Sequence, residues 1–253
     1  MIDTVSKCNI LGVGISIINM SQTLVIIEDW IENNNHQYVC VTPIHAIMNY
    51  QNNPNLLKIA NQSGLTTPDG MPVVWLLKLA GYKNVSRVYG PDLMLAVCEN
   101  GCKKNYRHYM YGSTTNVLLK LTDHLQNRFP GLIISGSYSP PFRILTDEED
   151  QEIINQINSV SPDIVWVGIG SPKQELWMAE HLNKINAKVM IGVGAAFDFH
   201  AGHIKQAPLW MQRSGLEWLF RLILEPKRLW KRYLIGYPKF VFLIIREIIL
   251  KKK

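Results

Sequence analysis

Apolar runs of strand length alternate with helical stretches through most of the chain. Five of these runs are suited to buried strands, at residues 38–41, 106–111, 132–135, 164–168 and 188–193. The segments between them have helical character, and Thr146 with Glu149 offers a capping box at the start of one. This alternation predicts an α/β fold with a largely parallel sheet flanked by helices. Ligands bind such sheets beyond the carboxyl ends of the strands, so the turns there are the expected place for chemistry.

Two of those turns contain paired glycines, at residues 168–171 and 192–195, which would bring backbone amides close to a phosphate. Neither completes the G-x-G-x-x-G fingerprint of dinucleotide-binding proteins, and tight turns also use glycine for purely steric reasons. A nicotinamide-dependent (NAD(P)) oxidoreductase therefore stays an alternative function for the chain, although its dinucleotide-binding fingerprint is incomplete. The first turn leads into Ser171, Pro172 and Gln174, which predict a serine cap, a proline at the first helical position and a second capping box.

The positive charge of the chain is concentrated at its C-terminal end. Of the net charge of +6, residues 204–253 contribute +9, from twelve basic and three acidic residues, which leaves −3 for the rest. The basic residues recur at helical spacings among leucine, isoleucine and tryptophan. We therefore expect residues 204–253 to form a basic amphipathic helical appendage on an α/β catalytic domain of residues 1–203. The apolar run at 240–245 is too short to cross a membrane, which takes about twenty apolar residues.

A basic amphipathic appendage is typical of binding to an anionic membrane surface, with its apolar side among the lipids and its Lys and Arg side chains on the headgroups. The alternatives are a C-terminal helix docked on its own domain and a non-catalytic membrane-surface scaffold. Nucleic acid is not expected as a partner, because the basic residues interleave with a continuous apolar face. The N-terminal sequence has no signal-peptide pattern. We therefore expect a peripheral protein on the cytoplasmic side of the cell membrane.

Asp69 is the first candidate for chemistry, because it lies immediately ahead of an apolar stretch, residues 73–79, that reads as a buried helix. An aspartate at that place either caps the helix, which is worth about 1 kcal/mol, or acts as a general base at the mouth of a loop. The spacing alone does not decide between these two roles.

Longer motifs give the chain a family resemblance. In chain order they are PDGMP at 68–72, RVYGPDLM at 87–94, SPPFR at 139–143, GIGSPKQE at 168–175 and GAAFDFHAG at 194–202, the last continuing through QAP and GLEWLFR to Tyr233. In order and spacing these motifs resemble the WecB/TagA/CpsF glycosyltransferases of bacterial cell-surface polysaccharide synthesis, over roughly residues 38–235.

The resemblance implies a Rossmann-like domain that moves a sugar from a UDP-sugar to a polyprenyl-diphosphate-linked saccharide. It also implies inversion at the anomeric carbon and no need for a metal or other cofactor. The chain contains no Asp-x-Asp pair, the usual holder of the cation in metal-dependent glycosyltransferases. Cationic side chains and backbone amides would then hold the diphosphate.

The resemblance also carries roles to individual residues. Asp69 matches the family's catalytic base, and His45 is a second catalytic candidate because a branch of the family has a histidine in that turn. The asparagine that family members often have there is absent, so its contact to the donor is not carried over. The expected substrate-binding residues are Thr42, Arg87, Gly90, Asp92, Gly170, Gln174, Glu175, Asp198, Arg221, Arg228 and Arg232. The last three would reach the diphosphate from the appendage.

Several of these residues also have structural explanations. Arg87 and Asp92 would make a surface ion pair if Arg87 does not hold a phosphate. The side chain of Gln174 is free for a ligand only if it does not close a capping box. Asp198 needs either a partner such as Arg213 or a substrate hydroxyl. The sequence leaves open the donor sugar, the acceptor glycan and the oligomeric state, a homo-oligomer included.

Overall fold

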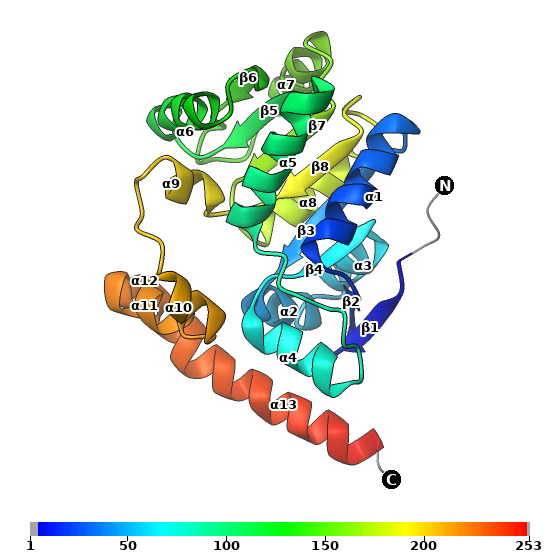
Figure 1. Ribbon diagram of the computed structural model, residues 1–253, viewed down its shortest axis with the longest axis vertical. Helices are drawn as coiled ribbons and strands as arrows, with labels where there is room; N and C mark the ends of the chain where they lie inside the picture. Colours follow the sequence, from blue (N-terminus) through cyan, green and yellow to red (C-terminus); the bar gives the residue numbers. More distant parts are fainter. Residues whose placement is uncertain (1–4, 252–253) are drawn as a thin grey trace.

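The computed structural model describes residues 5–251 and places six strands in one parallel sheet (Figure 1). The strands are β3 (Gln37–Thr42), β4 (Leu65–Pro68), β5 (Arg107–Gly112), β6 (Ile133–Tyr138), β7 (Ile164–Gly168) and β8 (Val189–Gly192). Their order across the sheet is β4-β3-β8-β7-β5-β6, and every neighbouring pair is parallel. The α/β fold predicted from the sequence is confirmed, and all five predicted runs are strands of this sheet.

Helices cover both faces of the sheet, which explains why its strands read as continuous apolar runs. The first nine helices are α1 (Met20–Glu32), α2 (Ile44–Gln51), α3 (Pro54–Gln62), α4 (Met71–Leu79), α5 (Gly90–Lys104), α6 (Thr115–Arg128), α7 (Asp147–Ser159), α8 (Lys173–His181) and α9 (Ala196–His200). One face of the strands, with Val39 and Trp166, packs against α1, α5, α6 and α9. The other face, with Tyr38 and Val165, packs against α3, α7 and α8.

Two strand regions escaped the sequence pattern. β4 has four residues, LTTP, and its two threonines are fully buried, with Thr66 Oγ1 donating to a backbone carbonyl at 3.0 Å. β1 (Lys7–Ile10) and β2 (Val13–Ser16) form an antiparallel hairpin whose two-residue turn has a leucine and a glycine with positive φ. None of the three has an apolar run long enough to identify a strand from sequence.

The predicted helix starts had different outcomes. The capping box of Thr146 and Glu149 is present at the start of α7, as predicted. The one expected at Ser171 is wrong: Pro172 itself occupies the N-cap position of α8, and no side chain caps that helix. Ser171 therefore lies one residue too early to cap, and the side chain of Gln174 is not used in a capping box.

After α9, residues 201–208 lead away from the sheet to a second group of helices (Figure 1). These are α10 (Leu209–Arg213), α11 (Glu217–Leu224), α12 (Pro226–Trp230), a π-helical turn η1 (Lys231–Ile235) and α13 (Gly236–Lys251). The predicted division of the chain near residue 204 coincides with this change of structure, although the appendage as a separate domain remains a prediction.

The inward face of α13 is docked on the rest of the protein. Phe240 is buried in an apolar cluster with residues of α2, α4 and the β1–β2 hairpin, and the Leu11 backbone amide donates to Glu247 at 3.3 Å. Other side chains of the same helix are exposed and apolar, including Phe242 and Ile249. No helix within residues 5–251 is both long enough and apolar enough to cross a membrane. The basic amphipathic character of this segment as a membrane-binding surface stays a prediction.

A candidate active site at the carboxyl edge of the sheet

A cleft of about 1080 Å³ opens where the parallel strands end, as the fold class predicts. Its sheet-side wall is made by the turns after β3, β4, β7 and β8, and the helices α11 and α12 with η1 supply the facing wall. Nine of the predicted site residues line it: His45, Asp69, Gly90, Gly170, Gln174, Asp198, Arg221, Arg228 and Arg232. Thr42, Arg87, Asp92 and Glu175 do not.

Asp69 directly follows β4, and the described residues leave its carboxylate only partly hydrogen-bonded. Gly70, not Asp69, is the N-cap of α4, and no side chain caps that helix, so the capping explanation for Asp69 is wrong. Its Oδ1 is buried and has no hydrogen-bond partner within the described chain. Burial raises the pKa of Asp69 to about 6, against the opposing effects of Arg87, the Gly90 backbone and Arg221. A carboxylate with that pKa in a cleft is a candidate general base.

Arg87 supports the Asp69 turn from behind instead of facing the cleft. Its Nε donates to the backbone carbonyl of Asp69, and its Nη2 lies 2.5 Å from Oε2 of Glu217. The guanidinium also lies 3.8 Å from the ring centroid of Tyr89, whose hydroxyl donates to Glu217 Oε1 at 2.7 Å. Asp92 is exposed, and within residues 5–251 it makes no ion pair with Arg87. The acidic partner of Arg87 is therefore Glu217, which the sequence analysis did not select.

Gln174 presents a buried amide to the cleft. Only 3% of Gln174 is exposed, yet it lines the cleft, and its Oε1 has no partner among the described residues. A Cβ at Gly192 would lie 2.8 Å from Met178 Cε and 3.0 Å from Gln174 Nε2, so a larger residue there would displace the ends of these two side chains. Glu175 lies further inside, where it accepts a hydrogen bond from Tyr50 at 2.9 Å and burial raises its pKa. Gln174 is thus placed to contact a ligand, whereas Glu175 is placed to support it.

Thr42 is also internal. It is fully buried, and its hydroxyl donates to the Cys40 carbonyl at 2.9 Å. His45, one turn further on, does line the cleft. Burial together with the nearby charges of Arg232 and Arg221 holds the pKa of His45 well below its usual value. His45 is therefore a neutral imidazole at physiological pH, and its catalytic role stays a prediction.

Three arginines form the facing wall. Arg221 comes from α11, Arg228 from α12 and Arg232 from η1. The pKa of Arg232 is lowered by burial and by the positive charges of Arg221 and Arg228, and the Nε of Arg221 is buried without a partner in the described structure. Glu225 is the acid near this group, 2.5 Å from Arg228 and 4.0 Å from Arg221. Three positive charges beside the one paired carboxylate of Glu225 suit an anionic ligand.

Asp198 lines the cleft from α9, the short helix that follows β8, but its partner is not the predicted one. Its Oδ1 lies 3.2 Å from Nδ1 of His203, while Arg213 is exposed and does not line the cleft. His203 directly follows the GAAFDFHAG motif, so its position next to that motif is the sequence feature that could have pointed to this contact.

The far end of the cleft holds an aromatic stack that sequence reasoning missed. Trp177 stacks on Tyr111 at 4.1 Å and on His181 at 4.3 Å between ring centroids, and His181 Nε2 lies 3.0 Å from Asp150. All four residues line the cleft. They come from β5, α7 and α8, so no local motif in the sequence could have joined them. Tyr111, Trp177 and His181 are all buried, so the stack forms an aromatic end of the cleft beside the Asp150 carboxylate.

Within residues 5–251, no group of three or more histidine, cysteine or acidic side chains is arranged to hold a metal ion. The cleft itself contains one carboxylate of raised pKa, a neutral imidazole, a buried amide and a cationic wall. These groups together suit an alcohol as nucleophile and a phosphate as leaving group.

Comparison with known proteins agrees with this chemistry. The profile of the glycosyl transferase WecG/TagA/CpsF family matches residues 8–253. The chain is 32% identical over 190 residues, covering 75% of itself and 71% of the relative, to an N-acetylglucosaminyldiphosphoundecaprenol N-acetyl-beta-D-mannosaminyltransferase of Bacillus subtilis. It is 28% identical over 243 residues, covering 95% of itself and 93% of the relative, to a Staphylococcus aureus protein of the same name.

These matches decide among the three classes that the sequence left open, namely glycosyltransferase, oxidoreductase and non-catalytic scaffold. The family profile spans both the sheet-side wall and the arginine wall of the cleft, so the resemblance is not confined to a common nucleotide-binding fold. The chain is an enzyme, and it belongs to the WecG/TagA/CpsF family of glycosyltransferases.

Proposed function

We propose that this enzyme transfers a sugar from a UDP-sugar to a saccharide carried on polyprenyl diphosphate, with inversion and without a metal, in the synthesis of a cell-wall, capsular or exopolysaccharide polymer. The relatives are named for transfer to N-acetylglucosaminyldiphosphoundecaprenol, a lipid of this class. The observation that carries the proposal is a cleft lined both by Asp69, whose Oδ1 has no partner among the described residues, and by the cationic wall of Arg221, Arg228 and Arg232.

In this proposal Asp69 removes the proton from an acceptor hydroxyl while that oxygen bonds to the anomeric carbon. The bond from the anomeric carbon to the diphosphate breaks on the opposite face, and UDP leaves with the electron pair. One displacement inverts the anomeric centre. A pKa of about 6 makes Asp69 a stronger base than an ordinary aspartate and still leaves it largely ionised at neutral pH.

The arginine wall takes the part that a divalent cation plays in other glycosyltransferases. The departing UDP gains negative charge, and preorganised cations and backbone amides aimed at that charge lower the barrier. Arg221 and Arg232 are half-buried, where a charge interaction is stronger than in water. The glycine turns after β7 and β8 line the same cleft and supply amides.

A lipid-linked acceptor requires the enzyme to work at a membrane surface, and we place it there as a peripheral protein on the cytoplasmic side. Exposed large apolar side chains gather on the second group of helices: Leu209, Trp210, Ile223, Leu224, Trp230, Leu234, Ile235, Phe242, Ile248, Ile249 and Leu250. Exposed lysines accompany them, including Lys227, Lys231 and Lys239. This combination supports binding to an anionic bilayer.

The test of the proposal is direct. The enzyme is incubated with N-acetylglucosaminyl diphosphate on a short polyprenyl chain and with a panel of UDP-sugars, including UDP-N-acetylmannosamine, UDP-glucose and UDP-glucuronic acid, and products are followed by mass. We expect transfer from one donor, a β-linked product where the donor is α-linked, and full turnover in EDTA. Asp69→Asn should lower kcat by about 10²–10⁴.

The matched control is Asp123→Asn, an exposed aspartate on α6 outside the cleft, which should keep full activity. If Asp69→Asn keeps full turnover, Asp69 is not the general base. Loss of turnover in EDTA, restored by a divalent cation, would refute metal independence.

A further inference from the structure

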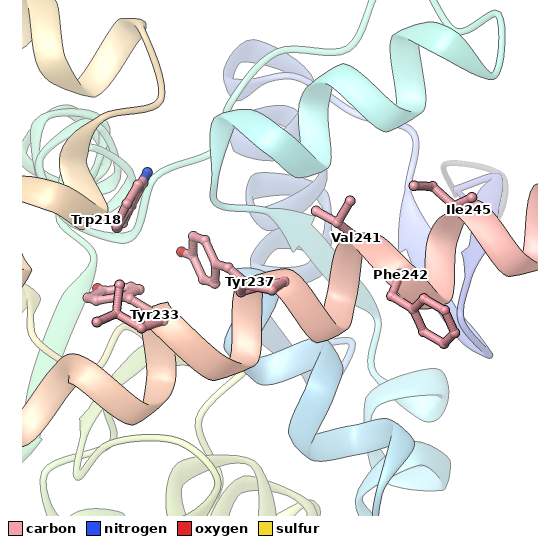
Figure 2. A pocket seen from close by; sticks show the side chains of 8 residues that line it. Trp218, Tyr233, Tyr237, Val241, Phe242 and Ile245 are labelled. Carbon is pink, nitrogen blue, oxygen red and sulfur yellow. The ribbon is translucent and has the colours of Figure 1, made fainter.

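An open apolar groove of about 550 Å³ lies along α13, separate from the active-site cleft (Figure 2). Its labelled lining residues are Trp218, Tyr233, Tyr237, Val241, Phe242 and Ile245. The three aromatic rings form one cluster, with Trp218 5.9 Å from both tyrosines and Tyr233 edge-on to Tyr237 at 5.1 Å. The proposed chemistry of the cleft uses none of these side chains.

Four of the residues make a stripe along one side of the helix. Tyr233, Tyr237, Val241 and Ile245 follow one another at intervals of four, which puts them on one helix face. From Tyr237 to Ile245 the stripe is about 12 Å long, at 1.5 Å per residue. The stripe is therefore longer than a single side-chain contact and suits an extended chain.

The groove is held in place by a neighbouring face of the same helix. Phe240 is 3% exposed and, with Leu243 and Ile244, packs into the cluster formed by α2, α4 and the hairpin. By contrast, Val241 is 53% exposed and Ile245 51%. The helix is thus anchored by its inward face. Val241 and Ile245 stay open to solvent, so the protein does not use these two side chains for its own packing.

The aromatic end of the groove lies near the charged groups of the cleft. Tyr233 and Tyr237 line the groove, and, besides burial, the charges of Arg232 and Asp69, which line the cleft, act on the pKa of both tyrosines. On the other side, Trp218 follows Glu217, which holds Arg87 behind the Asp69 turn. A ligand whose diphosphate meets the arginine wall would therefore have its adjoining hydrocarbon at the aromatic end of the groove.

We infer that this groove binds the first isoprene units of the acceptor's polyprenyl chain, next to the diphosphate. The inference rests on the proposed function, since it takes the acceptor to be a polyprenyl diphosphate. A nucleotide-sugar donor has no hydrocarbon to place there, so the groove belongs to the acceptor. Flat aromatic faces at the diphosphate end suit planar alkene units, and the aliphatic side chains beyond suit the rest of the chain.

The test uses two double variants. Val241→Ser/Ile245→Ser removes apolar contact from the groove, and Val25→Ser/Leu119→Ser removes similarly exposed apolar side chains of α1 and α6 that line neither the groove nor the cleft. Each variant is assayed in detergent with N-acetylglucosaminyl diphosphate linked either to farnesol, with three isoprene units, or to ethanol. Circular dichroism and thermal melting confirm that both variants are folded.

We expect the groove variant to raise the KM for the farnesyl acceptor about tenfold and to leave the KM for the ethyl acceptor and for the donor unchanged. The control variant should change none of the three. An equal rise for both acceptors, or no rise for the farnesyl acceptor, would overturn the inference. If the groove variant instead loses binding to phosphatidylglycerol vesicles with an unchanged KM in detergent, the groove contacts the bilayer and the inference is wrong.

Calorimetry with farnesyl diphosphate and with inorganic diphosphate tests the groove without turnover. The groove variant should weaken farnesyl diphosphate binding about tenfold and leave diphosphate binding unchanged; equal binding of farnesyl diphosphate by wild type and variant would refute the groove. If the wild-type enzyme binds farnesyl diphosphate through the groove but transfers no sugar to any acceptor, then the proposed function fails and the groove stands as a site for an isoprenoid diphosphate.

Discussion

The two walls of the cleft are built in different ways. The wall on the sheet consists of short turns after parallel strands, and its functional groups, Asp69, His45 and Gln174, are held by the core of the α/β fold. The facing wall consists of helices that follow residues 201–208, and its functional groups are the three arginines. In the proposed mechanism, proton transfer belongs to the wall on the sheet and charge neutralisation to the wall of helices that faces it.

The helices of the second wall are held on the protein by hydrogen bonds of two glutamates and by one buried apolar side chain. Glu217 joins α11 to Arg87 and Tyr89, and α13 is fixed by Phe240 and by the contact of Glu247 with the Leu11 amide. Changes in the arginine wall should therefore alter catalysis with little effect on the fold, whereas changes in the sheet-side wall should alter both. Three experiments test that difference.

Of these three experiments, the largest effect is expected from the arginine wall. Arg221→Gln and Arg232→Gln should each lower kcat by about 10²–10³, because each removes a preorganised charge that stabilises the leaving diphosphate. The thermal midpoint should not fall, since Arg232 lies beside two other cations and its removal relieves repulsion. Steady-state kinetics with saturating donor and a thermal melt of each variant measure the two quantities.

Arg213→Gln serves as the control, because Arg213 is exposed on α10 and does not line the cleft. It should keep wild-type kcat. Equal losses in all three variants would indicate a general dependence on surface charge, and the assignment of the arginine wall to the leaving group would then be wrong.

The second experiment changes Asp69 on the sheet-side wall, and the expected effect is on the free energy of unfolding. The pKa of Asp69 is about 6 in the folded protein and 3.8 for an ordinary aspartate, so the ionised carboxylate destabilises the fold by an amount that grows as the pH rises from 3.8 and is complete above pH 6. That cost disappears as the pH falls below 3.8. Asp69→Asn should therefore raise the free energy of unfolding by about 3 kcal/mol at pH 7.5 and by about 1 kcal/mol at pH 4.5.

Urea denaturation of both proteins at the two pH values measures this difference. Asp123→Asn, which changes an exposed carboxylate, should show no comparable gain at either pH. A loss of stability in Asp69→Asn at pH 7.5 would mean that the carboxylate is satisfied inside the fold. Asp69 would then be a structural residue and not one kept for catalysis at a cost in stability.

The same division between walls explains what could be predicted from the sequence. Strands such as β7, with five apolar or glycine residues in a row, and the turns that follow them have local patterns, so the sheet and the position of the cleft could be predicted from the sequence. The four-residue strand β4 could not, because buried threonines and a proline resemble a turn. Its absence from the prediction did not matter for Asp69, which was found through its motif.

Contacts between distant segments had no local pattern. Arg87 and Glu217 are 130 residues apart, and sequence reasoning gave Arg87 either a phosphate or Asp92 as its partner. The capping box at Gln174 failed for a related reason: the local pattern was correct for a helix start, but the helix begins one residue later, which leaves the Gln174 amide for the cleft. Sequence thus located the functional segments, while the structure was needed to pair them.

The smallest effect is expected where the two walls meet. Glu217 raises the pKa of Asp69 and partly neutralises Arg87, which lowers it. Glu217→Gln removes the negative charge and leaves Arg87 to act more strongly on Asp69. The pKa of Asp69 should fall, so the loss of kcat/KM on acidification should begin at a lower pH than in the wild type, and kcat/KM at pH 7.5 should drop about tenfold.

Glu217→Asp tests whether this effect comes from charge or from packing. It keeps the carboxylate, so its pH profile should stay near that of the wild type even if its rate is lower, whereas a purely structural role for Glu217 would lower the rate of both variants and move neither profile. Glu152→Gln, an exposed glutamate on α7 outside the cleft, is the control for loss of one negative charge. Because Glu217 belongs to α11 and Asp69 to the β4 turn, a shifted profile in Glu217→Gln alone would show that the docked helices set the basicity of the group on the opposite wall.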